Sequence, residues 1–550
     1  MLMTPFALYY VPDAYSLKGK VMGRQSAGVA FLRAVANTRP DRLWCYARSR
    51  ADAQTCAQEL VELGSPRTGV GWVPFLEPQR LGEAGLLYRP DPGIEQDAWR
   101  RLAHAQPDAY SLCGITHTTA SHVVMETLAR LPLAPLESWD ALICTSRAVR
   151  DSVRVLVENQ ADYLRERTGA TRFSLPQLPV IPLGVHVTQF AVTPDARFKA
   201  RAALGLMPDE TAVLFAGRLS FHGKAHPAPL YLALEANART NKIVLIQAGW
   251  FANEAIGNAF KDDAAKLCPS VRCLYVDGRH QDRLREAFAA SDIFTSLSDN
   301  IQETFGLTPL EAMAAGLPSV VTDWDGYRDT VRDGIDGYRV PTLAIPDGTA
   351  GDLAERYDMG LDTYDYYCAY TSQLAAVDVG ATTEAFRKLI HDPDLRARMG
   401  AAAQKRARTE FDWSVIFRRY LALWEELGER RRSEPRLSPA LSRRRRPERD
   451  DPFAVFASYA TRSVQRETHF EALGTYAGVS VADMLALETV GFARAVLPPE
   501  PYLNAVLARV RSGSAVSAGE IHRAAEGSWQ DVARALAWLA KMGLIRPVNG

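Results

Sequence analysis

The sequence predicts an α/β protein with two Rossmann-like domains that face a cleft, followed by a small, mainly α-helical C-terminal domain. Short β-rich runs alternate with helical patterns in two successive series, which is typical of parallel sheets covered on both faces. The 550 residues suffice for several domains at about 150 residues each. A run of arginines and prolines separates the last hundred residues from the rest.

The first series predicts a Rossmann-like domain over residues 1–192. We expect its strands at 6–11, 43–47, 109–114, 141–145 and 178–182. The glycine-rich loop 16–28 precedes an apolar helix, and it holds Gly19 and Gly23. Glycines let a backbone approach a phosphate or a sugar closely, so this loop is a candidate binding element.

The second series predicts another Rossmann-like domain over residues 193–408. Its strands are expected at 212–216, 242–249, 271–276, 293–296, 319–322 and 337–340. An insertion near 343–380 lacks a clear period and is rich in tyrosine, and packing is the expected role of these rings. A helix at 409–428 is expected to return to the first domain.

Residues 429–450 are predicted to form an arginine-rich linker. The run 430–449 holds nine arginines, two glutamates and three prolines, a composition that cannot bury a core. It is either a solvated spacer or an anchor for an anionic lipid, a nucleic acid or another partner.

The domain predicted over residues 451–550 is helical and winged-helix-like. Ser517 and Glu520 form a capping box that opens one helix, and Ser528 caps a second helix that ends near Met542. The second helix carries few basic residues, which disfavours DNA binding and favours a docking or dimerisation module.

The overall composition narrows the class of protein further. Lys plus Arg and Asp plus Glu both total 64, so the charge balance gives no argument for nucleic acid as a partner. The seven cysteines are scattered without a Cys-x-x-Cys pair, which argues against a disulfide framework or a structural zinc site. With no signal peptide and no spanning apolar run expected, we predict a cytoplasmic protein, with peripheral contact at the inner membrane face as the alternative.

The strongest motif runs from Glu303 to Pro318, Glu-Thr-Phe-Gly-Leu-Thr-Pro-Leu-Glu-Ala-Met-Ala-Ala-Gly-Leu-Pro. A helix capped by Thr308 is expected to begin here and to end at Gly316. Phe305, Gly306 and Leu307 would present N–H groups at its positive end, which is a site for an anion. Glu303 and Glu311 would both face the cleft, where carboxylates accept hydrogen bonds from sugar hydroxyls. The alternative is that Thr308 and Glu311 are only a capping box.

A second motif, Gly217-Arg218-Leu-Ser-Phe-His-Gly223-Lys224, follows the strand at 212–216. It places two cations at the carboxyl end of a strand, where α/β proteins bind ligands and where a diphosphate leaving group would be neutralised. Five residues separate the glycines and Ala225 stands where a Walker A loop has Ser or Thr, which disfavours an NTPase. The alternative is that both cations only add surface charge.

Together these residues resemble the retaining glycosyltransferases of family 4, glycosyl transferases group 1, which have the GT-B fold. The resemblance covers roughly residues 5–427 and rests above all on Glu303, Glu311 and the Glu-Ala-Met-Ala-Ala-Gly-x-Pro run. It implies that Glu311 binds the nucleotide ribose, Glu303 the donor sugar, and Arg218 with Lys224 the diphosphate. It also implies that residues 1–192 form the acceptor-side domain and residues 193–408 the nucleotide-sugar-binding domain. The family spaces this Arg and Lys five apart, whereas here they are six apart.

The first half of the chain matches the family more loosely. His117 follows the strand at 109–114, where the family carries a histidine near the donor sugar, and a structural role is the equal alternative. In Val-Ile-Pro-Leu-Gly-Val-His at 180–186, His186 replaces the family's frequent Asp.

The resemblance implies an enzyme that moves a sugar from a nucleotide-diphosphate sugar to an acceptor, with retention of anomeric configuration and with no metal or other cofactor. The acceptor class stays open between a glycan, a lipid-linked molecule and a small molecule. Three alternatives also stay open: a metal-dependent transferase that uses Asp323-Trp-Asp325, an epimerase or hydrolase of the same fold, and a non-catalytic sugar-nucleotide-binding protein whose tail engages a partner.

Overall fold

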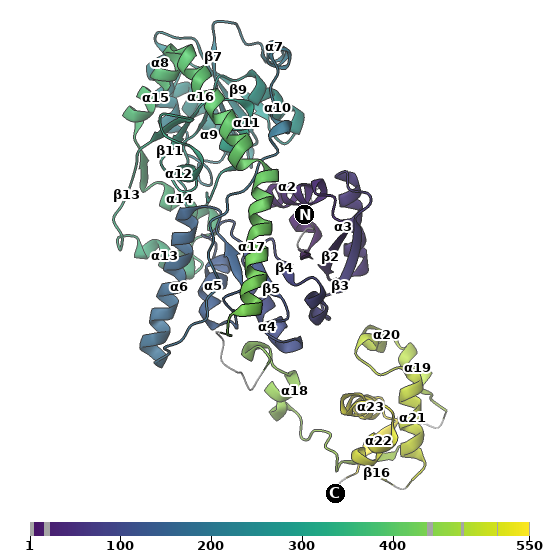
Figure 1. Ribbon diagram of the computed structural model, residues 1–550. Helices are drawn as coiled ribbons and strands as arrows, with labels where there is room; N and C mark the ends of the chain where they lie inside the picture. The colour runs from purple at the N-terminus through teal and green to yellow at the C-terminus, as the bar shows by residue number, and fades with distance from the viewer. Residues whose placement is uncertain (1–4, 16–22, 437–443, 475–477, 514, 549–550) are drawn as a thin grey trace. The chain divides into compact units, whose positions relative to one another are not determined.

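The computed structural model describes residues 5–15, 23–436, 444–474, 478–513 and 515–548 (Figure 1). The chain divides into two compact units, Met1–Arg445 and Arg446–Gly550. The first unit holds both parallel sheets, and the second holds the C-terminal helices.

The first sheet is parallel and six-stranded in the order β3-β2-β1-β4-β5-β6. This doubly wound order reverses direction between β1 and β4, and ligands bind at such a switch point. Its strands are β1 (Ala7–Tyr10), β2 (Arg42–Ala47), β3 (Gly69–Pro74), β4 (Leu86–Tyr88), β5 (Ser111–Ile115) and β6 (Ala141–Ile143). Its helices are α1 (Pro12–Tyr15), α2 (Gly23–Asn37), α3 (Arg50–Glu62), α4 (Ile94–His104), α5 (His122–Ala129) and α6 (Arg147–Thr168).

The prediction of a strand at 178–182 is wrong. This segment makes one isolated bridge, between Cys144 and Val180, and no strand. Pro179 and Pro182 have no N–H to donate, so a regular ladder cannot form there. The sheet gains β3 and β4 instead, which the sequence did not reveal.

The second sheet has the equivalent order β12-β11-β10-β7-β8-β9, and every predicted strand of this series is confirmed. The strands are β7 (Thr211–Ala216), β8 (Ile243–Gly249), β9 (Arg272–Asp277), β10 (Ile293–Ser296), β11 (Ser319–Thr322) and β12 (Gly337–Val340). The helices are α7 (Pro194–Ala203), α8 (Ala228–Ala238), α9 (Glu254–Leu267), α10 (Gln281–Ala290), α11 (Leu307–Ala315), α12 (Tyr327–Thr330), α15 (Val379–His391) and α16 (Pro393–Arg406). Strands buried along both faces explain the near-continuous apolar runs of the sequence.

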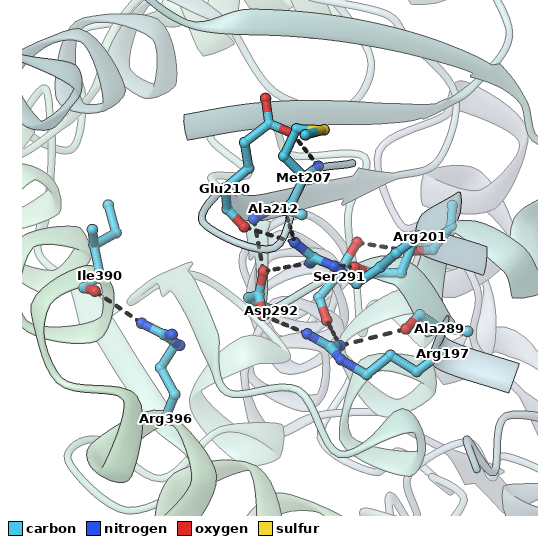
Figure 2. Close-up of polar contacts among 12 residues, drawn as sticks. Arg197, Arg201, Met207, Glu210, Ala212, Ala289, Ser291, Asp292, Ile390 and Arg396 are labelled. Atoms are coloured by element: carbon cyan, nitrogen blue, oxygen red, sulfur yellow. Dashed lines mark hydrogen bonds and ion pairs between the residues drawn. The ribbon is translucent and has the colours of Figure 1, made fainter. Parts of the chain in front are cut away.

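Helix α7 fastens the start of the second domain to the amino ends of β7 and β10 (Figure 2). Arg197 and Arg201 each form an ion pair with Asp292, at 2.5 and 3.1 Å. Asp292 also accepts a hydrogen bond from the N–H of Ala212, at 2.8 Å. Because this network lies at the amino ends, it leaves the carboxyl ends of the same strands available for a site.

Helix α17 (Trp413–Ser433) returns to the first domain, where it packs against α2 and β5 (Figure 1). The two chain crossings between the domains are paired, because the N–H of Val185 donates to Phe411 O and the N–H of Trp413 donates to Val185 O, at 2.8 and 3.1 Å. The helix runs five residues past its predicted end, so the linker predicted from residue 429 begins later. Arg431 holds this last turn by donating to the carbonyls of Gly85 and Ala109.

The tyrosine-rich insertion folds into a small structure of its own. Strands β13 (Thr342–Ala344) and β14 (Ala375–Val377) pair antiparallel and bracket α13 (Gly351–Asp358) and α14 (Tyr364–Ser372).

The C-terminal unit is mainly helical around a three-stranded antiparallel sheet in the order β16-β15-β17. Its elements are α18 (Pro452–Val455), β15 (His469–Ala472), α19 (Val481–Ala486), α20 (Glu488–Gly491), α21 (Glu500–Arg511), β16 (Val516–Ser517), α22 (Ala518–Ala524), α23 (Trp529–Lys541) and β17 (Ile545–Pro547). The predicted caps are confirmed, since Ser517 and Ser528 form capping boxes with Glu520 and Asp531. Across the described parts of both units, no helix has the length and apolarity needed to cross a membrane.

Candidate functional site

The candidate site lies at the carboxyl ends of β7 and β10, which are neighbours in the second sheet. The loop 217–227 follows β7 and the loop 297–306 follows β10. Adjacent parallel strands bring these loops together although about 80 residues separate them in the chain.

Lys224 and Glu303 meet across these two loops. Lys224 Nζ donates to Glu303 Oε2 at 2.9 Å. Burial by itself would raise the pKa of Glu303, but the Lys224 ammonium and the N–H groups of Thr304 and Phe305 outweigh it and hold this pKa below its usual value. Glu303 is therefore an anion at neutral pH. Although Lys224 follows Arg218 by six residues instead of the family's five, its ammonium still reaches Glu303.

Arg218 reaches Gln302, the residue before Glu303. Its Nη2 is 3.5 Å from Gln302 Oε1, and a Cβ on Gly223 would stand 2.8 Å from that same Nη2. Glycine at 223 thus leaves room for the guanidinium. The structure brings both predicted cations and Glu303 into one place.

Helix α11 begins at Leu307 with Gly306 as its N-cap, so the predicted cap at Thr308 is wrong. No side chain caps this end, which also overturns the alternative of a Thr308–Glu311 capping box. Gly306 takes φ +79°, and a Cβ there would stand 2.2 Å from Tyr327 Cε1, so the chain turns into the helix on a residue that only glycine fits.

The start of α11 presents backbone N–H groups at its positive end, as predicted from Phe305, Gly306 and Leu307. The N–H of Phe305 is used by Glu303. Among the described residues, none accepts a hydrogen bond from the N–H of Gly306 or Leu307. These two groups are suited to an anion.

Glu311 lies in α11 and is half-buried. Burial raises its pKa to about 7, and within the described chain it has no hydrogen-bond or ion-pair partner. The two glutamates therefore differ: Glu303 is held as an anion by a cation, whereas Glu311 is a carboxylate whose acceptor atoms have no protein donor.

Asp325 is a functional candidate that the sequence did not single out beyond its Asp-x-Asp pattern. It is half-buried with φ +42°, and burial followed by the negative charge of Glu303 raises its pKa to about 7. Ser146 Oγ donates to it at 3.1 Å, whereas Asp323 forms an ion pair with Arg339 at 3.2 Å. The two carboxylates thus have different partners.

The first domain carries the remaining predicted residues, and among the described residues the cavity that His117 lines includes neither of the two cations and neither glutamate. His117 lies at the carboxyl end of β5, and its Nε2 is 2.9 Å from Pro90 O. It lines a small cavity together with Gly28, Phe31, Tyr88 and Trp413. Gly23 begins α2, and Gly19 lies outside the described residues. The predicted loop 16–28 therefore ends earlier than expected, and Gly28 lies inside α2, where a Cβ would stand 2.0 Å from Ala14 O, so this glycine permits close contact with α1.

Contacts at the start of α6 hold the two domains against each other beside the site. Ser146 Oγ donates to Thr304 O at 2.9 Å, and the Arg147 guanidinium pairs with Asp329 at 2.6 Å. Thr304 directly follows Glu303, so these contacts connect the first domain to the segment that carries the site.

Comparisons with known proteins place these residues in a family context. Residues 196–356 match the family glycosyl transferases group 1. The chain is 29% identical over 343 residues to the D-inositol 3-phosphate glycosyltransferase of Stackebrandtia nassauensis, covering 60% of this chain and 67% of that protein. It is 29% identical over 223 residues to the enzyme of the same name from Nocardia farcinica, covering 39% of this chain and 48% of that protein. The matches thus span about half to two thirds of the length of these relatives.

The structure also resembles a solved one. Anabaena HepE, crystallised in complex with UDP, is similar with a TM-score of 0.50 and 18% identity over 77% of this chain and 100% of that chain. This likeness concerns the fold, and it confirms the predicted GT-B arrangement of two Rossmann-like domains.

Proposed function

We propose that the chain transfers a sugar from a nucleotide-diphosphate sugar to an acceptor hydroxyl, because residues 196–356 match the family glycosyl transferases group 1. The observation that carries the proposal is the placement of Lys224, Arg218, Glu303 and Glu311 at the carboxyl ends of β7 and β10. The diphosphate of such a donor requires cations and backbone N–H groups. Its sugar and ribose hydroxyls require carboxylates that accept hydrogen bonds.

The mechanism that we propose is electrostatic. As the bond between the anomeric carbon and the diphosphate breaks, negative charge grows on the leaving group. Arg218, Lys224 and the N–H groups at the start of α11 stabilise that charge. Glu303, held as an anion, accepts hydrogen bonds from the donor sugar and favours the positive charge that develops on its ring.

Glu311 has the complementary role at the other end of the donor. Its unpartnered carboxylate accepts hydrogen bonds from the ribose hydroxyls. We propose retention of configuration, as the family resemblance implies: the acceptor hydroxyl attacks on the face that the diphosphate leaves, and its proton passes to the departing diphosphate oxygen, so that no enzyme nucleophile takes part. His117 is proposed to contact the donor sugar from the first domain.

A binding panel tests the proposal. Calorimetric titration with UDP, GDP, ADP and TDP is expected to single out one nucleotide, with binding lost in Glu311→Ala and unchanged by EDTA. Binding that depends on a divalent metal and ignores Glu311 would contradict the site and favour the metal-dependent alternative. The sugar form of the selected nucleotide then serves as donor.

Donor turnover separates the transferase from its alternatives of the same fold. A transferase consumes donor at a rate that rises steeply with a suitable acceptor, and the names of the curated relatives make inositol phosphates the first acceptors to try. An epimerase or hydrolase consumes donor equally well without acceptor. Binding without turnover in any mixture would indicate a sugar-nucleotide-binding protein.

We also propose that the tail of the chain contacts a membrane surface or a protein partner. Phe453 and Tyr459 of the C-terminal unit are 89% and 83% exposed, and Arg446 and Arg449 lie close to them in sequence. Aromatic rings beside cations suit an anionic lipid surface. Co-sedimentation with anionic and with neutral vesicles tests this: retention on anionic vesicles, lost in Phe453→Ser/Tyr459→Ser, is the expected result, and no retention would contradict the membrane proposal.

A further inference from the structure

The tyrosine-rich insertion spans from the second domain to the first, directly beside His117. Tyr364 OH lies 3.1 Å from Thr118 Oγ1, and Thr118 follows His117 in the chain. The N–H of His122 donates to Tyr357 OH at 3.2 Å, and the two rings stack with centroids 3.4 Å apart. Two tyrosines thus fasten α13 and α14 to the loop after β5.

On its other side, the insertion is fastened to Asn300, which follows β10 and is fully buried. Asn300 Nδ2 donates both to Cys368 O of α14 and to His222 O of the Lys224 loop, at 3.3 and 2.7 Å. Asn300 Oδ1 accepts from the N–H of Gln302 at 2.8 Å. One buried amide therefore joins three segments that are far apart in sequence.

The residues next to Asn300 hold the same loop. Ser298 Oγ donates to Lys224 O at 3.1 Å, and Asp299 accepts from the N–H of His226 at 3.4 Å. Three consecutive side chains after β10 thus bind the backbone of the loop on both sides of Lys224 and at Lys224 itself. The loop is also held by a bridge between Leu219 and Phe251 and by a backbone bond from Lys224 N–H to Ser220 O, and the three side chains add bonds to the part that carries Lys224.

The burial of Asn300 makes this link sensitive to displacement. A buried N–H that is left without an acceptor is unfavourable, because its desolvation is no longer compensated. If α14 moves away from Asn300, the Asn300 side chain is therefore expected to turn toward another acceptor. If the Asn300 side chain turns to a new position, its bond to His222 changes as well, because both N–H groups belong to one rigid amide. The loop then loses one of the contacts that hold Lys224 beside Glu303.

We propose that Asn300 is a positioning residue for the transfer reaction: through it, docking of the insertion on the first domain sets the place of Lys224 beside Glu303. The role in catalysis rests on the proposed function. The mechanical link does not, and it is tested without any ligand.

The ligand-free test compares backbone amide exchange in peptides that cover residues 218–227. Tyr357→Phe/Tyr364→Phe removes two hydroxyls and keeps both rings, so the fold is expected to persist. Exchange of the loop should quicken about fivefold, the effect of one lost hydrogen bond of ordinary strength. Tyr366→Phe is the matched control, since this tyrosine of α14 is 58% exposed and faces neither contact. Unchanged exchange of the loop in the double variant would overturn the proposal.

A cycle with Asn300→Ser tests whether the link runs through this residue. In the Asn300→Ser background the loop is already loosened, and the tyrosine changes should add nothing to its exchange. Additive effects of the two changes would overturn the role of Asn300. Should Asn300→Ser not fold, Asn300→Asp, which keeps the shape of the side chain and alters its donor, replaces it in the same cycle.

The catalytic part is measured on donor turnover with the nucleotide sugar that the panel selects. Tyr357→Phe/Tyr364→Phe should lower kcat about tenfold and change the KM for donor less than twofold, because Lys224 acts on charge that grows in the transition state. A change confined to KM would overturn the positioning role. An inactive wild-type protein would instead contradict the proposed function and leave the exchange result standing.

Discussion

The pKa values of Glu303 and Glu311, two glutamates of one motif, are shifted in opposite directions. Lys224 and two backbone N–H groups lower the pKa of Glu303, whereas burial without a partner raises the pKa of Glu311 to about 7. Separated pKa values in one cleft assign separate tasks, here charge stabilisation and hydrogen-bond acceptance.

The pH dependence of nucleotide affinity follows from Glu311. Ribose hydroxyls donate to the charged carboxylate, so binding below pH 7 must first remove a proton from Glu311. The association constant is expected to fall as pH decreases from 8 to 6, approaching about tenfold per pH unit. Calorimetry at three pH values measures this fall, and Glu311→Gln should bind weakly with no such slope. A slope that persists in Glu311→Gln would assign the titration to another group, such as Asp325.

Removing the lysine should reveal its electrostatic role in stability. In Lys224→Met, Glu303 keeps a largely buried charge without its cation, and we expect the free energy of unfolding to fall by about 1–3 kcal/mol. The folded-state pKa of Glu303 is below its usual 4.5, so this contribution is complete above about pH 4.5 and disappears as pH falls further. Urea unfolding at pH 7 measures the loss, and Lys224→Met/Glu303→Gln should recover most of it. No recovery would mean that the lysine acts by packing.

At the level of residues, the sequence predicted which side chains gather but not what holds them. The Arg218, Lys224 and Glu303 positions follow from strand order, because loops after neighbouring parallel strands must meet. Asn300 and Asp325 escaped notice because their roles depend on hydrogen bonds to segments whose placement is a tertiary property. The functional roles of all these residues stay predictions.

Among the elements, the start of α11 is the most constrained. Gly306 combines φ +79° with a ring only 2.2 Å from its virtual Cβ, and that ring belongs to Tyr327, whose hydroxyl is bonded to Ser296 at 2.7 Å. Gly306→Ala should therefore cost about 2–4 kcal/mol of unfolding free energy, from left-handed strain and overpacking together.

The control for this element separates strain from overlap. Gly64 has φ +90° with nothing within 4 Å of a virtual Cβ, so Gly64→Ala should cost only about 1 kcal/mol. Thermal unfolding of both variants measures the difference. Equal losses would show that the Tyr327 ring moves aside.

The elements that the sequence missed share a physical reason. Strand β3 begins Gly-Val-Gly-Trp, and β4 has three residues, so neither offers a recognisable β pattern. The cap at Thr308 was a reasonable expectation from local chemistry, but the left-handed Gly306 ends the preceding loop two residues earlier. In both cases tertiary contacts, with the sheet or with the Tyr327 ring, determine the local structure, and the intrinsic preference of the residues does not.

For the molecule as a whole, two compact units predict two unfolding events. Scanning calorimetry of the full chain should show two transitions, because the units have separate cores. A protein ending at Arg445 should keep one of them at an unchanged Tm. A single transition in the full chain, or a shifted Tm in the shortened one, would mean that the units stabilise each other.

The paired crossings at Val185 and Trp413 limit the directions in which one Rossmann-like domain can rotate relative to the other. Two domains joined by a single chain crossing can twist as well as bend relative to each other, whereas two adjacent crossings restrict the domains to rotation about one axis. The backbone bonds between the two crossings tie them together, and a Cβ on Gly184 would stand 2.6 Å from the Trp413 ring, which leaves no slack between them. Any rotation of one domain relative to the other must therefore keep these two crossings together, and separation at the start of α6 must break the hydrogen bond from Ser146 Oγ to Thr304 O.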